Sequence, residues 1–235
     1  MSKIQSIRGM RSILPEETPL WQWLEGKVRA ITRRYGYQEV RLPLLKPLSL
    51  FERAVGESTD IVAKEMYHFL DKSGEHITLR PEGTSGRARA VIENNLCYNT
   101  TQRLWYQGPM FRYERPQKGR LRQFTHSGVE TFGMPGPDID AELIYLAKDI
   151  FQTLNVDRYL RLAINSPGTL PERKEHRTQL VDYFHQHHAL LDEDSLSRLA
   201  PPPAYSRQQK SANAENARRC AETSGFPGQR ITMPF

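Results

Sequence analysis

The stretch from Arg112 to Arg122 holds the densest group of side chains able to do chemistry. Eleven residues carry five basic groups and one carboxylate: Arg112, Glu114, Arg115, Lys118, Arg120 and Arg122. Guanidinium groups bind phosphate oxygens in bidentate fashion, and they do so best when rigid elements hold both ends of the loop that carries them. The pattern predicts a phosphate-binding loop, with a solvated hairpin tip as the ordinary alternative.

Aromatic residues border this loop on both sides, namely Phe111, Tyr113 and Phe124. Such rings can stack on a base or fill a core. Strand alternation puts Arg112 and Glu114 on one face. Buried charges are costly unless they are paired or bind a ligand, so this face is a candidate binding surface.

Two further carboxylates stand where a ligand could reach them. Glu82 lies in the segment Arg80-Pro-Glu-Gly-Thr84, directly before a predicted helix, and could hold an ammonium group. In the alternative reading, Thr84 is simply the helix N-cap. Glu130 lies on the strand that follows the basic loop, and it is either an inward carboxylate with a partner or an outward strand residue.

Other kinds of site are not supported. The three histidines His185, His187 and His188 stand at the end of a predicted helix, where the helix dipole favours them, and no cysteine lies nearby. We therefore predict no metal site. The glycine-rich loops of dinucleotide-binding and Walker-type proteins are absent from the sequence.

Length and composition exclude several classes of protein. The 235 residues include 33 Lys+Arg and 27 Asp+Glu, which gives a net charge of +6 and permits a polyanionic partner. The length suits one core with a small appendage. No apolar run reaches the roughly 18–20 residues of a membrane span, no signal peptide is visible, and Cys97 and Cys220 suggest free thiols. We expect a cytoplasmic protein without membrane contact.

Periodicity and turn residues predict the elements that must position these groups. Helices are expected over 19–35, 85–94, 137–154 and 170–188, with short helices and loops over 44–66. Strands are expected over 37–43, 66–70, 76–79, 103–113, 123–133 and 159–164. Hairpin-joined strands between groups of helices predict an α+β domain on a mostly antiparallel sheet. This domain covers residues 1–199. The remaining segment, 200–235, lacks a sustained apolar period and is expected to be disordered.

Several long segments resemble histidyl-tRNA synthetases of the bacterial type, which are class II aminoacyl-tRNA synthetases. The resemblance begins at Ile7-Arg-Gly-Met10 and includes Tyr37-Gln-Glu-Val-Arg-Leu-Pro43, which is similar to the first class II motif. Met110-Phe-Arg-Tyr-Glu-Arg-Pro-Gln-Lys-Gly-Arg120 with Arg122-Gln-Phe124 resembles the second motif. Leu79-Arg-Pro-Glu-Gly-Thr84 and Gly136-Pro-Asp-Ile-Asp-Ala-Glu142 are also typical of the family.

The resemblance implies a class II synthetase-like sheet flanked by helices, here incomplete, and ATP-dependent ligation of histidine to tRNA(His) through histidyl-adenylate. It implies Mg²⁺ together with ATP, a homodimer with Pro43 at its interface, and Arg112 as the catalytic residue at the α-phosphate. ATP would be bound by Arg112, Glu114, Arg120 and Phe124. Histidine would be bound by Glu82, Gly83, Thr84, Arg112, His126 and Glu130. The tRNA acceptor end would meet Arg115, Gln117 and Lys118.

Two departures from the family pattern bear on this inference. His126 stands where the family has a histidine-binding Gln, which predicts weaker binding of the amino acid. The sequence also lacks the third motif, so we expect this chain to be inactive alone. The codons of Ala204–Ser211, read one nucleotide later, can encode the family continuation, which suggests a frameshifted tail. The alternatives are a non-catalytic synthetase-like regulator of histidine biosynthesis and a tRNA-binding fragment.

Overall fold

The computed structural model describes residues 4–55, 61–165, 168–192, 195–196, 199 and 229–234. They fall into two compact units, one of Met1–Arg158 with Ser211–Phe235 and the other of Tyr159–Lys210. The first unit contains the residues of the predicted site. Within the described residues, no helix has the length and apolarity needed to cross a membrane.

A four-stranded sheet forms the centre of the first unit, in the order β1-β5-β6-β7. Its strands are β1 (Gln38–Glu39), β5 (Gln102–Phe111), β6 (Gln123–Phe132) and β7 (Gln229–Pro234). β1 runs parallel to β5, and the other neighbours are antiparallel. The long β5–β6 hairpin holds both ends of the basic loop. The prediction of an α+β fold on a mostly antiparallel sheet is confirmed.

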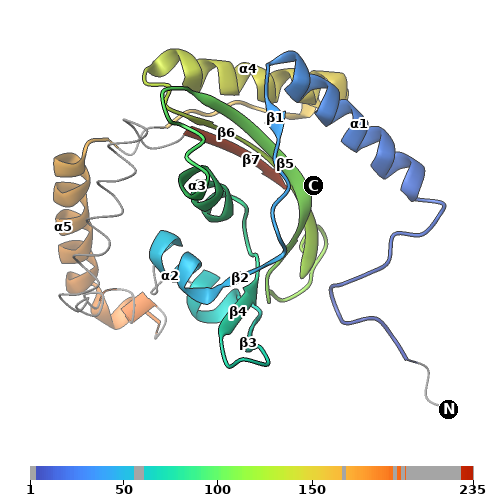
Figure 1. Ribbon diagram of the computed structural model, residues 1–235. Helices are drawn as coiled ribbons and strands as arrows, with labels where there is room; N and C mark the ends of the chain where they lie inside the picture. Colours follow the sequence, from blue (N-terminus) through green and yellow to red (C-terminus); the bar gives the residue numbers. More distant parts are fainter. Residues whose placement is uncertain are drawn as a thin grey trace. The chain divides into compact units, whose positions relative to one another are not determined.

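Helices α1 (Thr18–Arg34) and α4 (Pro137–Thr153) cover one face of this sheet (Figure 1). Their apolar stripes at helical spacing bury the main core. Its members are Val28, Ile31, Tyr37, Trp105, Val129, Leu143, Leu146 and Ile150. Both helices lie close to where the sequence predicts them.

Helix α3 (Thr84–Glu93) lies against the opposite face of the sheet (Figure 1). Val91 of α3 packs there with Leu104, whose neighbour Trp105 points into the other core. Strand alternation therefore puts even-numbered residues of β5 and β6 on the α3 face. This is the face of Tyr106, His126 and Glu130.

A smaller sheet leads the chain into α3. Its order is β2-β4-β3, from β2 (Leu45–Pro47), β3 (His68–Leu70) and β4 (His76–Leu79), and it is accompanied by α2 (Leu48–Val55) and the π-helix η1 (Ile61–Glu65). The predicted hairpin is confirmed. Asp71 closes its turn, because Oδ1 accepts hydrogen bonds from the amides of Ser73 (2.8 Å) and Glu75 (2.9 Å).

The second unit contains α5 (Leu170–Gln186) and the 3-10 helix η3 (His188–Leu190). Thr169 and Glu172 form a capping box at the start of α5. The predicted strand over 159–164 is wrong, because the chain forms the 3-10 helix η2 (Asp157–Tyr159) and then continues without strand pairing through residue 165. Alternation alone does not make a strand when no neighbouring strand supplies hydrogen bonds.

The predicted tail over 200–235 lies outside the described residues except for Gln229–Pro234. These six residues form β7, which pairs with His126–Thr131 of β6. Here the structure has a regular strand where irregular chain was expected.

Candidate functional site

The basic loop between β5 and β6 is held by specific contacts at both ends. The amides of Arg122 and Gln123 both donate to the carbonyl oxygen of Gly9, at 2.8 and 3.1 Å. Gly9 has φ +81°, and a Cβ on it would lie 2.9 Å from the Arg122 side chain. The N-terminal segment therefore needs glycine here to approach the loop.

Arg112 connects this loop to the start of α3. Its Nε donates to the carbonyl oxygen of Pro81 at 3.0 Å, and its guanidinium carbon lies 5.4 Å from the centre of the Phe124 ring. The Glu114 carboxylate lies 3.8 Å from Nη1 of Arg112 and 3.5 Å from Nη1 of Arg120. The structure thus brings together the four residues predicted to bind ATP.

The start of α3 is capped by Glu82. One carboxylate oxygen accepts from the amide of Thr84, and the other accepts from the amide of Ser85 at 2.9 Å. These amides are among those that an α-helix leaves without partners. The N-cap reading of Thr84 is wrong, since Gly83 precedes the helix and Glu82 supplies the capping oxygens.

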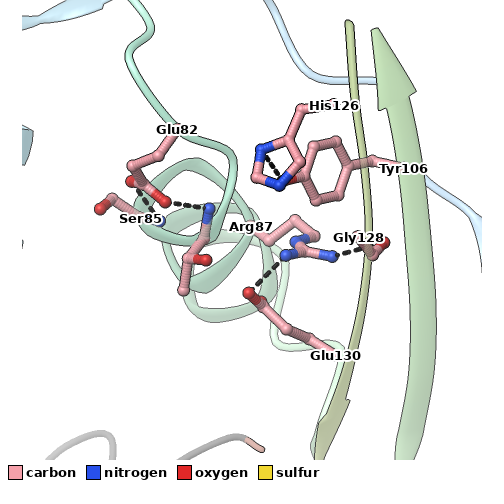
Figure 2. Close-up of polar contacts among 8 residues, drawn as sticks. Glu82, Ser85, Arg87, Tyr106, His126, Gly128 and Glu130 are labelled. Atoms are coloured by element: carbon pink, nitrogen blue, oxygen red, sulfur yellow. Dashed lines mark hydrogen bonds and ion pairs between the residues drawn. The ribbon is translucent and has the colours of Figure 1, made fainter. Parts of the chain in front are cut away.

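Tyr106 lies at the centre of the α3 face, and two glycines make room for its ring. A Cβ on Gly83 would lie 2.3 Å from the ring, and one on Gly128 would lie 2.6 Å from it. The hydroxyl of Tyr106 lies 3.2 Å from Nδ1 of His126, at hydrogen-bond distance (Figure 2). Any side chain in place of either glycine would displace this ring.

Arg87 and Glu130 form an ion pair beside Tyr106. Nη2 of Arg87 contacts Oε1 of Glu130, and Nη1 donates to the carbonyl oxygen of Gly128 at 3.1 Å (Figure 2). The guanidinium carbon lies 4.1 Å from the centre of the Tyr106 ring. Arg87 is 0% exposed and Glu130 is 2% exposed. Glu130 is therefore an inward carboxylate with a cationic partner.

His126 is held in its neutral form. Burial lowers the pKa of this imidazole to about 4, and the positive charges of Arg112 and Arg87 act in the same direction. The side chain is 7% exposed. A neutral ring has one donor and one acceptor nitrogen, so His126 can pair with the Tyr106 hydroxyl in either direction.

The remaining predicted site residues lie at the surface. Arg115, Gln117 and Lys118 are exposed at the tip of the loop, where Gln117 and Arg120 form an isolated bridge. Pro43 is exposed after β1. His187 lies at the end of α5 and hydrogen-bonds the Tyr183 carbonyl oxygen (2.9 Å).

No group of three or more potential metal ligands occurs among the side chains that the structure describes. Beside the arginines of the loop, the Glu114 carboxylate contacts both Arg112 and Arg120.

Sequence reasoning missed Arg80, Arg87 and Tyr106. Arg80 is buried and donates to the carbonyl oxygens of Pro109 (2.9 Å) and Leu42 (2.8 Å). Arg87 lies one helical turn before the buried Val91, and an arginine on a buried helix face signals a partner. Nothing in the pattern around Tyr106 marks it as a site residue.

Comparison with known proteins identifies the relatives of this chain. The family model for histidyl-tRNA synthetase matches residues 9–188. The structure is similar to apo histidyl-tRNA synthetase of S. aureus, with 37% identity and a TM-score of 0.55 over 64% of this chain and 40% of that one.

It is also similar to an ATP phosphoribosyltransferase regulatory subunit/histidyl-tRNA synthetase from Bacillus halodurans C. The identity is 26% and the TM-score is 0.56, over 65% of this chain and 38% of that one. The matched region thus spans about two fifths of the length of either solved structure.

Proposed function

The chain belongs to the histidyl-tRNA synthetase family, and from this premise we propose that the protein carrying it ligates histidine to tRNA(His). In this reaction the histidine carboxylate attacks the α-phosphate of ATP, which releases pyrophosphate and forms histidyl-adenylate. The aminoacyl group then passes to the 3′ end of the tRNA, and AMP leaves.

The position of Arg112 is the observation that carries this proposal. One side of its guanidinium contacts the start of α3, beside Glu82, and the other faces the Phe124 ring. A fixed cation at this point can contact the carboxylate of an amino acid and the α-phosphate of ATP together. Such placement holds both reactants and stabilises the charge that develops during displacement.

The neighbouring residues would divide the two substrates between them. The Phe124 ring would stack on adenine, and the Glu114 carboxylate would accept a hydrogen bond from the base. The Arg120 guanidinium would pair with the outer phosphates. On the amino-acid side, Glu82, Gly83 and Thr84 would surround the ammonium group, and His126 and Glu130 would face the imidazole. Mg²⁺ would enter as the ATP complex.

The tRNA and the second subunit would meet exposed parts of this unit. Arg115, Gln117 and Lys118 carry positive charge to the loop tip, where a phosphate backbone can reach them. Pro43 and the exposed Leu44 and Leu45 suit a homodimer contact. We place the protein in the cytoplasm, where tRNA is charged.

A second candidate function is a histidine-binding regulator without catalysis. The name of the Bacillus halodurans relative favours it, since that name joins a regulatory subunit with a synthetase. A regulator needs the amino-acid pocket but not the ATP site. The complete set of Arg112, Glu114, Arg120 and Phe124 around one loop favours the enzyme.

Calorimetric titration of MgATP and of histidine into the chain tests the proposal. We expect both ligands to bind, with each raising the affinity for the other because Arg112 contacts both. Arg112→Ala should weaken both, while Arg173→Ala, an exposed arginine on α5, should weaken neither. Histidine binding without any ATP binding would support the regulator and contradict the enzyme.

A further inference from the structure

The N-terminal segment makes a tight turn against the basic loop between β5 and β6. The amide of Met10 donates to the carbonyl oxygen of Ile7 at 2.9 Å, and Gly9, the third residue of this turn, has φ +81°. A type II turn requires a positive φ at this position, which glycine adopts without strain. Since the carbonyl oxygen of Ile7 closes the turn, that of Gly9 can bond to another segment.

The Gly9 oxygen holds the arm of the loop that leads into β6. It accepts hydrogen bonds from the amides of Arg122 and Gln123, at 2.8 and 3.1 Å. These two residues lie between Arg120, which the proposed function assigns to the outer phosphates, and Phe124, which it assigns to adenine. One carbonyl oxygen thus fixes the backbone that spaces these two side chains.

Arg122 extends this contact to the arm that leaves β5. Its carbonyl oxygen accepts from the amide of Arg112 at 2.9 Å, and its Nε donates to the carbonyl oxygen of Glu114 at 3.0 Å. Its guanidinium carbon also lies 3.9 Å from the centre of the Tyr113 ring. The backbone of both residues proposed to bind ATP on this arm is therefore held by Arg122.

The turn and the loop are so close that only glycine fits between them. A Cβ on Gly9 would lie 2.9 Å from Cγ of Arg122 and 3.0 Å from Cγ of Pro116. Pro116 and Arg122 belong to opposite arms of the loop, so a side chain on residue 9 would push against both arms. The positive φ adds backbone strain for any residue that carries a Cβ.

Resting on the proposed function, we propose that Gly9 is a positioning residue for ATP, and that its turn holds the β5–β6 loop in the conformation that binds the nucleotide. The proposed histidine site is anchored separately. Glu82 caps α3, and the side chain of Arg112 donates to the carbonyl oxygen of Pro81 at 3.0 Å. A shift of the loop should therefore reduce the affinity for ATP and leave that for histidine.

Separate titrations of MgATP and of histidine into Gly9→Ala test this role. A misplacement of about 1 Å can cost on the order of 10²-fold in a reaction, so for a smaller loop shift we expect the MgATP affinity to fall about tenfold. The affinity for histidine alone should stay within about twofold, because its anchors do not involve Gly9.

Gly36→Ala is the matched control. Gly36 also has a positive φ, +77°, but a Cβ there would meet no atom within 4 Å. The substitution therefore introduces the same kind of backbone strain without a contact to the loop. It should leave the affinities for both ligands unchanged.

The outcomes separate this inference from the proposed function. Equal MgATP affinities in Gly9→Ala and Gly36→Ala would overturn the inference, and so would equal losses of MgATP and histidine affinity in Gly9→Ala. In both cases the unaltered chain still binds its two ligands, so the proposed function stands. Absence of MgATP binding by the unaltered chain would contradict the proposed function, and this inference with it.

Amide hydrogen exchange on the unaltered chain covers the case in which Gly9→Ala does not fold. If the closed contact favours MgATP, then MgATP favours the closed contact by the same factor. The amides of Arg122 and Gln123 should therefore exchange about tenfold more slowly with saturating MgATP. The amide of Glu75, bonded to Asp71 in the β3–β4 turn, should not change. Unchanged exchange at Arg122 and Gln123 would overturn the inference.

Discussion

Nε of Arg112 donates a 3.0 Å hydrogen bond to the carbonyl oxygen of Pro81, across 31 residues of sequence. This bond joins the end of β5 to the segment that starts α3. It brings the basic loop, which would hold ATP, next to Glu82, which would hold the amino acid. Together with the 3.0 Å hydrogen bond from the Phe111 amide to the carbonyl oxygen of Arg80, this contact holds the two proposed subsites next to each other.

Substitutions of Phe124 and Arg112 should distinguish binding of the adenine base from binding of the phosphates. Phe124→Ala removes the ring that would stack on adenine, and loss of one such contact is worth roughly 1–3 kcal/mol. We expect it to weaken ATP binding about 5- to 160-fold and to leave binding of inorganic triphosphate unchanged. Arg112→Ala should weaken both ligands. Competition titrations with the two ligands give the comparison, and equal losses for Phe124→Ala would contradict the stacking role.

Glu82 should stabilise the fold as well as the site. Glu82→Gln leaves one acceptor oxygen where two now bind amides of the first turn of α3, and it removes a charge that favours the helix N-terminus. We expect a loss of about 1 kcal/mol in the free energy of unfolding, measured by urea titration. Glu93→Gln, at the exposed end of the same helix, is the control. If both variants unfold alike, the capping role is wrong.

His126 should make the stability of the chain fall in mild acid. Its folded pKa of about 4 lies below the value of 6.5 for an ordinary histidine. The unfolded chain therefore takes up a proton first as the pH falls, so the stabilising effect of the neutral ring is complete above pH 6.5. It declines between pH 6.5 and 4 and is lost below.

Comparison with His126→Gln isolates this contribution from the other titrating groups. Between pH 7.5 and pH 5, the original chain should lose about 2 kcal/mol more of its free energy of unfolding than the variant does. His68→Gln, on the exposed strand β3, should behave like the original chain. Parallel losses in the original chain and His126→Gln would show that the imidazole titrates normally. Titration of histidine into the same variant tests the expectation that Gln strengthens binding.

Local patterns predicted the elements that hold the site, because each depends on residues close in sequence. The apolar spacing of α1 and α4 and the turn at Asp71 are of this kind, and so is the alternation on both sides of the basic loop. The error at 159–164 has the opposite cause. Leu160, Leu162 and Ile164 alternate as in a strand, yet a strand forms only where a neighbour pairs with it.

The chemistry of the loop was visible in the sequence, whereas the centre of the pocket was not. Arg112, Glu114 and Arg120 are close in sequence, so their grouping could be predicted. Arg87 and Glu130 are 43 residues apart, and their pairing depends on α3 packing against β6. The sequence left Glu130 either as an inward carboxylate with a partner or as an outward strand residue, and only the fold shows that it is buried and paired with Arg87.

ATP–pyrophosphate exchange tests the central claim most directly. It should be measured with and without histidine on the full protein that carries this sequence. The account predicts exchange that requires histidine, is not supported by lysine or arginine, and is lost in Arg112→Ala. Histidine binding with no exchange, in a protein that does not bind ATP, would contradict the account and identify a regulator.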